Sequence, residues 1–318
     1  MAWMRDRLDQ MLKSPDPEKL IEQPSGLWRG AFRRLLRRKT GVIGMSIIGL
    51  MVLVALAAPV LAPHNPNQVL IGVEENIKRR DSPCVHLLGC ADEKPQHILG
   101  LDGNARDEFS RIIYGSRVSL SVGLTTVLVA FTIGASLGAI AGFWGKWIDN
   151  VIMRIMDVVL GFPALLLAIA IVAALGPGLR NTLLAIAVVS IPVYARVMRA
   201  SVLSIKELDF VAASRALGAS SGRILWTRVI PNALTPLVVI ATLGIATAIL
   251  DAAAFGFLGL GAQEPTAEWG SMLARERNQV FSAPHLVFFP GLAIMITVLG
   301  FNLLGDGLRD ALDPSLAE

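Results

Sequence analysis

Long runs without a charged residue alternate with short, strongly charged segments along this chain. A helix that crosses a bilayer needs roughly 20 consecutive apolar residues, because its backbone N–H and C=O groups find no water in the hydrocarbon and must pair within the helix. Five runs of about that length or longer contain no Asp, Glu, Lys or Arg, at residues 41–63, 118–145, 158–179, 229–250 and 278–305. The pattern predicts a membrane protein built from transmembrane helices.

A sixth, shorter run at residues 181–195 lies between Arg180 and Arg196. It reaches the length of a span when both arginines extend their side chains toward the two membrane surfaces. The composition agrees, since 53% of the 318 residues are hydrophobic and only 17% are charged. We therefore expect an all-α, polytopic membrane protein with six transmembrane helices.

The distribution of basic residues predicts the orientation of these spans. Cytoplasmic segments of membrane proteins carry an excess of Lys and Arg, and such a cluster directly precedes the first span: Arg29, Arg33, Arg34, Arg37, Arg38 and Lys39. We expect residues 1–40 to be cytoplasmic, 41–63 to form the first span, 64–117 an extracytoplasmic cap segment, 118–305 the membrane domain and 306–318 a cytoplasmic tail. A net charge of +4 requires no nucleic-acid partner, because topology and contacts with membrane lipid account for it.

The two cysteines of the chain, Cys84 and Cys90, both fall in the predicted cap segment. In an oxidising compartment a disulfide that closes this small loop is the simplest interpretation. Two alternatives stay open at this point: free thiols, and a metal site in which His86 and His97 join the two cysteines. Because the spacing matches no familiar zinc pattern, we expect the disulfide and no metal.

Two acidic residues lie within or beside the predicted spans. Asp157 follows Arg154 by three residues, a spacing that lets the two side chains pair on one helix face. Asp251 has no basic neighbour in the sequence, so it is a candidate for a transport pathway or for a bond between helices. Gly134 and Gly138 form a small-residue face that is typical of close helix packing.

Motifs for catalysis are missing from the sequence. A P-loop requires Gly, four residues and then Gly-Lys-Ser/Thr, so that backbone amides hold the phosphates, whereas the single Gly-Lys pair here, at Gly145, is followed by Trp147. We therefore expect a chain that is not an enzyme and binds no cofactor itself.

A polar, Ala- and Gly-rich segment interrupts the apolar runs at residues 210–231 and has the sequence FVAASRALGASSGRILWTRVIP. It resembles the cytoplasmic coupling loop of ABC importer permeases, with Ala212, Ala213 and Ser214 at the family's Glu-Ala-Ala positions. The resemblance implies a coupling helix at about residues 206–225 that docks on an ATPase. Its candidate residues are Phe210, Ala212, Ala213, Ser214, Arg215, Leu217, Gly218, Ala219, Ile230 and Pro231.

Three further segments resemble the dipeptide and oligopeptide branch of that family, and most closely its C-type subunit. They are residues 97–120, 257–273 and 305–314, and Leu101 and Ala105 depart from the family's usual threonine and glycine. The resemblance implies the type I importer architecture and a place in the bacterial inner membrane. It also implies four kinds of partner or ligand: a second homologous permease, two ABC ATPases that bind ATP and Mg, an extracytoplasmic binding protein, and its peptide cargo.

The predicted outer loops carry polar residues that could receive the binding protein. We expect this docking face to include Asp102, Arg106, Asp107, Glu264, Glu268 and Trp269. Two other functions stay open, namely the same machinery with nickel or another small solute as cargo, and a self-sufficient secondary transporter. The latter usually needs inverted repeats, and no repeat of fixed period is visible here.

Overall fold

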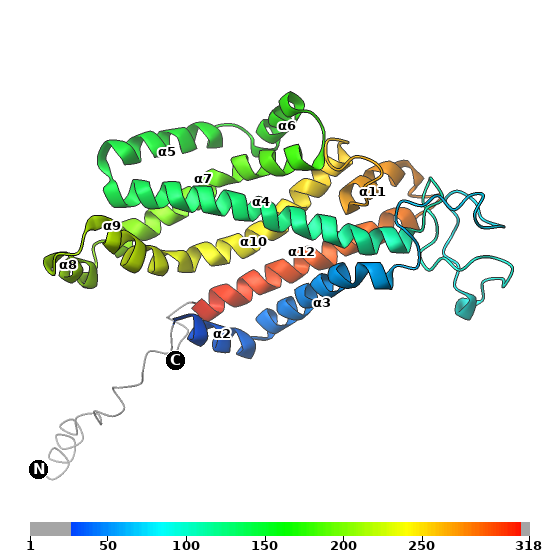
Figure 1. The fold of residues 1–318 in the computed structure, drawn as a ribbon, viewed down its shortest axis with the longest axis horizontal. Helices are drawn as coiled ribbons and strands as arrows, with labels where there is room; N and C mark the ends of the chain where they lie inside the picture. Colours follow the sequence, from blue (N-terminus) through cyan, green and yellow to red (C-terminus); the bar gives the residue numbers. More distant parts are fainter. Residues whose placement is uncertain (1–26, 313–318) are drawn as a thin grey trace, which may run out of the picture.

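The structure, a computed structural model, describes residues 27–312, and most of them form helices (Figure 1). The long helices are α3 (Lys39–Leu61), α4 (Glu108–Trp144), α5 (Lys146–Leu160), α6 (Ala164–Leu175), α7 (Leu179–Ile205), α10 (Ile230–Phe257) and α12 (His285–Leu312). The shorter elements are α2 (Leu27–Arg37), η2 (His86–Leu88), α8 (Asp209–Ala216), α9 (Ser221–Ile224), the π-helical turn η3 (Leu225–Val229), α11 (Trp269–Glu276) and η4 (Arg277–Gln279).

Five helices in the described part are long and apolar enough to cross a membrane: α3, α4, α7, the continuous stretch Ser221–Phe257, and α12. The pair α5 and α6 gives a sixth span if the two helices cross together. The expected all-α, polytopic fold is confirmed. Helices suit a bilayer, where no water can bind the backbone, because every N–H and C=O group in the middle of a span is hydrogen-bonded within the helix.

The third predicted span is not a straight helix. α5 and α6 meet at an angle of 89°, and the break falls at Gly161, Phe162 and Pro163. Pro163 has no N–H to continue the helix, and its ring disfavours helical backbone at the preceding Phe162. The charge-free run at residues 158–179 therefore does not form one straight helix, and it gives a span only if α5 and α6 cross together.

Three predicted boundaries also shift, because helices here extend past the charge-free runs. α4 already begins at Glu108, so the loop outside the membrane ends ten residues before position 117; we call residues 64–107 the cap. α7 contains both Arg180 and Arg196. α12 continues to Leu312, well past Gly305.

The ends of the bundle differ in character. α2, α8 and the end of α12 lie at one end of the molecule, and the cap and α11 lie at the other (Figure 1). The described parts of the two predicted cytoplasmic segments thus lie at the same end as the basic segment that contains α8. Residues 1–26 and 313–318 of the predicted cytoplasmic segments lie outside the described residues.

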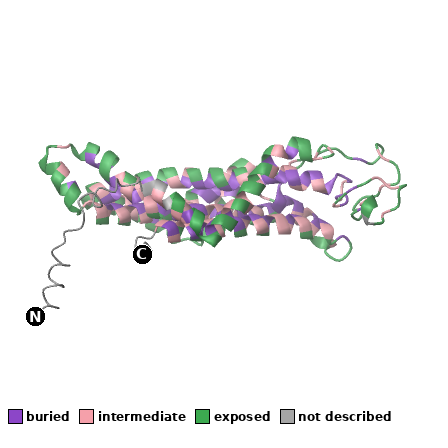
Figure 2. Ribbon diagram, turned by 90° about the horizontal axis from the view of Figure 1, so that it is seen from below, coloured by how far each residue is buried: buried purple, intermediate pink, exposed green. Residues whose placement is uncertain are grey.

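α4 and α7 form the most extensive helix–helix contact of the bundle. A Cβ atom at Gly134 would lie 2.6 Å from the carbonyl oxygen of Ile191, and one at Gly138 would lie 2.9 Å from the Cβ of Met198 and overlap the carbonyl oxygen of Ala195. The small-residue face at Gly134 and Gly138 is therefore the place where the two backbones meet. Figure 2 shows buried residues along the interior of the bundle and exposed ones over its outer surfaces.

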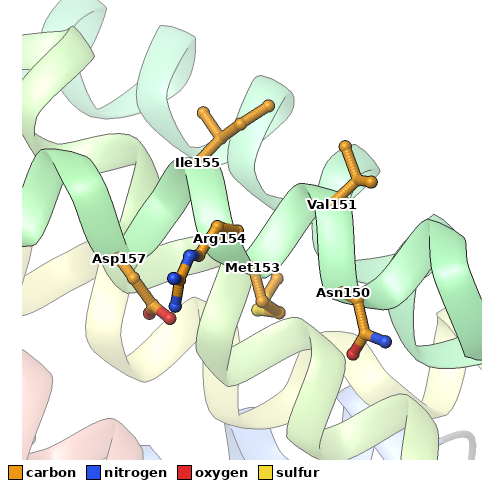
Figure 3. Close-up of a pocket in the computed structure, with 6 residues that line it drawn as sticks. All are labelled: Asn150, Val151, Met153, Arg154, Ile155 and Asp157. Carbon is orange, nitrogen blue, oxygen red and sulfur yellow. The ribbon is translucent and has the colours of Figure 1, made fainter.

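Ion pairs join α5 to α7. Asp149 accepts hydrogen bonds from Arg199 at 2.5 and 2.6 Å, and Asp157 accepts one from Arg196 at 2.6 Å. The predicted pair of Asp157 with Arg154 on the same helix is therefore wrong, because the partner comes from the neighbouring helix. Figure 3 shows Arg154 and Asp157 on one side of α5 and the apolar Ile155 on another.

We predict that Gly138→Leu destabilises the bundle by about 1–3 kcal/mol or more, because the new side chain meets the α7 backbone. The matched control is Gly49→Leu on α3, where no atom lies within 4 Å of the added Cβ. Thermal unfolding of both purified variants in detergent measures the difference. Equal melting temperatures for the two variants would show that the α4–α7 contact is not a tight one.

Candidate functional site

The segment that resembles a coupling loop folds as two short helices, α8 and α9, rather than as one helix over residues 206–225. Val211 fixes α8 in place, since its side chain is fully buried. It packs into one apolar cluster with residues at the ends of the neighbouring helices, namely Met198, Val202, Ile224, Leu225, Val229, Ala233 and Leu237. Through this single contact α8 is joined to both α7 and α10.

The other side of α8 faces outward. Leu217 is 88% exposed and Phe210 40% exposed, although both are large and apolar. Ala212, Ala213 and Arg215 are exposed as well. A small, partly apolar surface that ends in a charged residue is suited to docking against another protein.

The end of α8 is a tight turn. Gly218 has a φ of +83°, in the left-handed region that glycine adopts without strain. The amide of Gly218 donates to the carbonyl of Arg215 and that of Ala219 to the carbonyl of Ser214, at 3.0 and 3.1 Å. Ile230 and Pro231 lie at the start of α10, directly after the π-helical turn η3. The π-helical turn η3 connects α9 to α10 without a break and was not predicted from the sequence.

A second candidate region is a cavity within the bundle around Asp251. Two adjoining hollows of about 210 and 250 Å³ share Ser190, Val193, Thr247 and Asp251. Among the residues that the structure describes, none pairs with the Asp251 carboxylate. Of the two predicted roles, a bond between helices finds no support, and Asp251 instead lines the cavity together with two hydroxyl-bearing side chains.

Most of the residues expected to form a docking face are covered. Asp102, Arg106, Asp107, Glu268 and Trp269 are each at most 3% exposed, so the expectation that they bind a soluble partner directly is wrong. Glu264, whose side chain is 50% exposed, is accessible. The sequence could not reveal the burial of Glu268 and Trp269, because their covering groups come from α4, about 150 positions earlier in the chain.

These buried residues hold the two outer loops together. Asp102 pairs with Arg106 at 2.7 Å, and Arg106 reaches Glu264 at 3.4 Å across 158 positions of the sequence. In the same way Arg80 of the cap donates to Glu276 of α11 at 2.7 Å. These contacts join the cap rigidly to α11 and to the loop that contains Glu264. We call this joined surface the outer platform.

Helix capping explains two of the buried acids. Asp107 caps α4 by accepting from the amide and hydroxyl of Ser110 at 2.8 and 2.6 Å. Burial acts to raise the pKa of Asp107, but the hydrogen bonds from His97 and Ser110 lower it more, so the carboxyl stays ionised. Glu268 caps α11 through the amides of Gly270 and Ser271, and there burial prevails and raises the pKa of Glu268.

Trp269 fixes the position of α11 on α4. Its indole N–H donates to the carbonyl of Ile112 at 3.0 Å. Gly115 allows this approach, since a Cβ there would lie 2.9 Å from the indole ring.

Cys84 and Cys90 form a disulfide in the cap, with Cα atoms 5.4 Å apart. The bonded sulfurs are no thiolate ligands, and His86 instead contacts the carbonyl oxygen of Lys94 at 2.7 Å. The structure therefore does not form the alternative metal site of Cys84, Cys90, His86 and His97. The fourth residue of that set, His97, lies between the carboxylates of Asp107 and Glu74, at 3.0 Å from each.

Comparison with known proteins places this geometry in a family. A family model described as "Binding-protein-dependent transport system inner membrane component" matches residues 134–318, more than half of the chain. The chain belongs to this family. A second model, "N-terminal TM domain of oligopeptide transport permease C", matches residues 26–79. The permease is therefore a multi-pass transport component of the inner membrane, as predicted.

Similar permeases match over nearly their whole length. The "Dipeptide transport system permease protein DppC" of Alkalihalophilus pseudofirmus is 47% identical and the match covers 95% of this chain and 94% of that protein. The "Di/tripeptide transport system permease protein DppC" of Pseudomonas aeruginosa is 43% identical over 97% of this chain and 99% of that protein. The "Glutathione transport system permease protein GsiD" of Pectobacterium atrosepticum is 43% identical over 91% of both chains. The predicted resemblance to the C-type dipeptide permease is confirmed.

Among solved structures, the inward-facing MetNI methionine ABC transporter resembles this permease with a TM-score of 0.53. The two chains are 20% identical, and the match covers 64% of this chain and 96% of the other. This likeness confirms the ABC-importer permease architecture.

Proposed function

We propose that this permease forms one half of the path by which an ATP-driven importer carries di- or oligopeptides across the inner membrane. Its similar proteins are named for dipeptides, di/tripeptides and glutathione, which supports a peptide over nickel as cargo. The other half of the path comes from a second, homologous permease. A binding protein delivers the peptide at the outer platform, and two cytoplasmic ABC ATPases, which bind ATP and Mg, drive the cycle.

One observation carries the coupling mechanism: α8 is exposed on one side and buried on the other. Its exposed residues, such as Ala213 and Leu217, are free to dock on an ATPase, while Val211 ties it to α7 and α10. When the ATPases close on ATP, α8 moves with them and carries both helices along. Because the packed bundle has discrete arrangements rather than continuous ones, this motion switches the path between outward- and inward-open states.

We predict that Ala213→Trp and Gly218→Trp abolish ATP-dependent peptide uptake while the permease still inserts in the membrane. A large side chain at the docking surface overpacks it by about 1–3 kcal/mol, which corresponds to roughly 5- to 150-fold weaker association with the ATPase. Uptake in membrane vesicles and ATPase recovery in pull-downs measure the two effects.

The matched control is Leu87→Trp, at a side chain of the cap that is 94% exposed. The cap lies at the end of the bundle opposite α8 (Figure 1). This variant should retain ATPase recovery. If both variants of the α8 segment transported at the wild-type rate with ATPase fully bound, this segment would not be the coupling element.

Asp251 is the residue that we assign to cargo in the path. A peptide enters with a positively charged amino terminus, and the Asp251 carboxylate is an acceptor for it beside the hydroxyl groups of Ser190 and Thr247. A hydrogen bond to a charged group contributes about 1.5–3 kcal/mol. The contact would therefore favour entry of the peptide into the membrane without holding it too tightly for release.

We predict that Asp251→Asn lowers dipeptide uptake by roughly 10- to 100-fold, because the amide keeps the shape of the carboxylate and loses its charge. ATPase recovery in pull-downs should be unchanged. The control is Glu93→Gln, which removes the same charge at an exposed site in the cap. Uptake by Asp251→Asn at the level of Glu93→Gln would exclude this role of Asp251.

A further inference from the structure

Three side chains of the cap converge on one point. His64 Nε2 lies 3.2 Å from Glu74 Oε1, and His97 Nε2 lies 3.0 Å from Glu74 Oε2. One potential ligand atom from each residue lies within 4.8 Å of the other two. The three residues come from separate parts of the cap, so the loop's fold rather than their spacing in sequence brings them together.

Asp107 lies behind both imidazole rings and hydrogen-bonds that of His97. Its Oδ1 lies 3.0 Å from His97 Nδ1, and its Oδ2 lies 3.9 Å from His64 Nδ1. With the Nδ1 proton of His97 directed to Asp107, the Nε2 lone pair of His97 points at Glu74. A carboxylate behind a histidine whose other nitrogen faces a common centre is the arrangement that supports metal-binding histidines.

The contact between His97 Nε2 and Glu74 then needs a cation. Two acceptors 3.0 Å apart repel each other unless a proton or a metal ion lies between them. A divalent ion between these side chains would balance the charges of the Asp107 and Glu74 carboxylates. Neutral imidazole and carboxylate are also the forms in which these groups bind metals.

We propose that His64, Glu74 and His97 bind a divalent transition-metal ion of the Zn²⁺ type, with Asp107 as the positioning residue for His97. Two imidazole nitrogens and one carboxylate oxygen form a known three-residue zinc ligand set. Ligands at about 2.0–2.1 Å in a tetrahedron lie roughly 3.3 Å apart, so the present separations close around an ion through small side-chain rotations.

The surroundings of the site suit such an ion. His97 is 3% exposed, whereas His64 and Glu74 are each about one-fifth exposed, so an ion has a route from the outer solvent to a largely enclosed position. The fourth ligand position would go to water. The disulfide supports the site, because the amide of Cys84 donates to the carbonyl of His97 at 2.8 Å and holds that residue in place.

The ion would lock the cap onto the membrane domain. His64 follows the end of α3 directly, and its amide donates to Ser110 of α4 at 3.1 Å. Glu74 and His97 belong to the middle of the cap, and Asp107 caps α4. A single ion would therefore join the ends of two spans to the loop between them, on the outer platform where the binding protein docks.

The experiment measures Zn²⁺ binding to the whole permease, purified with a tag that contains no histidine and stripped with a chelator. Titration against a chromophoric zinc chelator should show one Zn²⁺ per chain. His64→Ala and Glu74→Gln should each weaken binding by at least about 100-fold, since loss of a supporting residue alone typically costs 10- to 100-fold. His86→Ala, which removes a cap histidine outside the cluster, should bind as the wild type does.

A second measurement keeps the test decisive if a variant folds poorly. Added Zn²⁺ should slow proteolytic cleavage of the cap in the wild type and in His86→Ala, but not in His64→Ala. Absence of Zn²⁺ binding by the wild type at micromolar concentration would overturn the proposal. So would retention of full Zn²⁺ affinity by both His64→Ala and Glu74→Gln.

Discussion

The close contact between α4 and α7 is the constraint on which the rest of the permease depends. Gly134 and Gly138 place the two backbones so near that no side chain fits between them. Association of helices in lipid relies on such packing, because lipid tails are as apolar as the side chains and give no hydrophobic force between helices. Tightly packed helices move as one body, so a displacement at one end of α7 reaches its other end.

Charged residues lie at both ends of the bundle, beyond this apolar contact, and they have a different role at each end. At one end, Val211 secures α8 to α7 and α10 while the charged and apolar residues of α8 face outward. At the other end, the cap is tied to the second outer loop by Arg106, which is buried against Asp102 and reaches Glu264, and by Arg80, which pairs with the buried Glu276. Breaking a buried pair by removing one partner is strongly destabilising, so the outer platform is stiff and the α8 end offers an open surface.

The sequence predicted the features that depend on local composition. Charge-free runs located the spans, and the orientation inferred from the basic clusters stays a prediction. The charge-free runs alone predicted the start of α4 too late. Glu108 and Arg111 lie inside this helix, because its first turns are covered by protein rather than by lipid. The Gly-Phe-Pro triplet at residues 161–163 is a local sequence signal for the break at Pro163. Counting spans from charge-free runs alone ignored it.

Features that depend on distant contacts could not be predicted in this way. The burial of Glu268 and Trp269 results from packing on α4, about 150 positions earlier in the chain. His64, Glu74 and His97 have no regular spacing, and only the fold of the cap brings them together. Gly218, by contrast, could be identified from the sequence in two ways. It matches the motif of the family, and glycine is the residue type that a turn with a positive φ favours.

The central claim, that the ATPases act on the permease through α8, is tested most directly by photo-cross-linking from Leu217→Cys labelled with a benzophenone maleimide. Cys84 and Cys90 are joined in a disulfide, so the introduced thiol takes up the label. Our account predicts that light cross-links this position to an ATPase subunit in the assembled importer and that the same label at Leu87→Cys gives no such product. Cross-linking to an ATPase from the cap, or its absence from α8 in a complex that transports, would contradict the account.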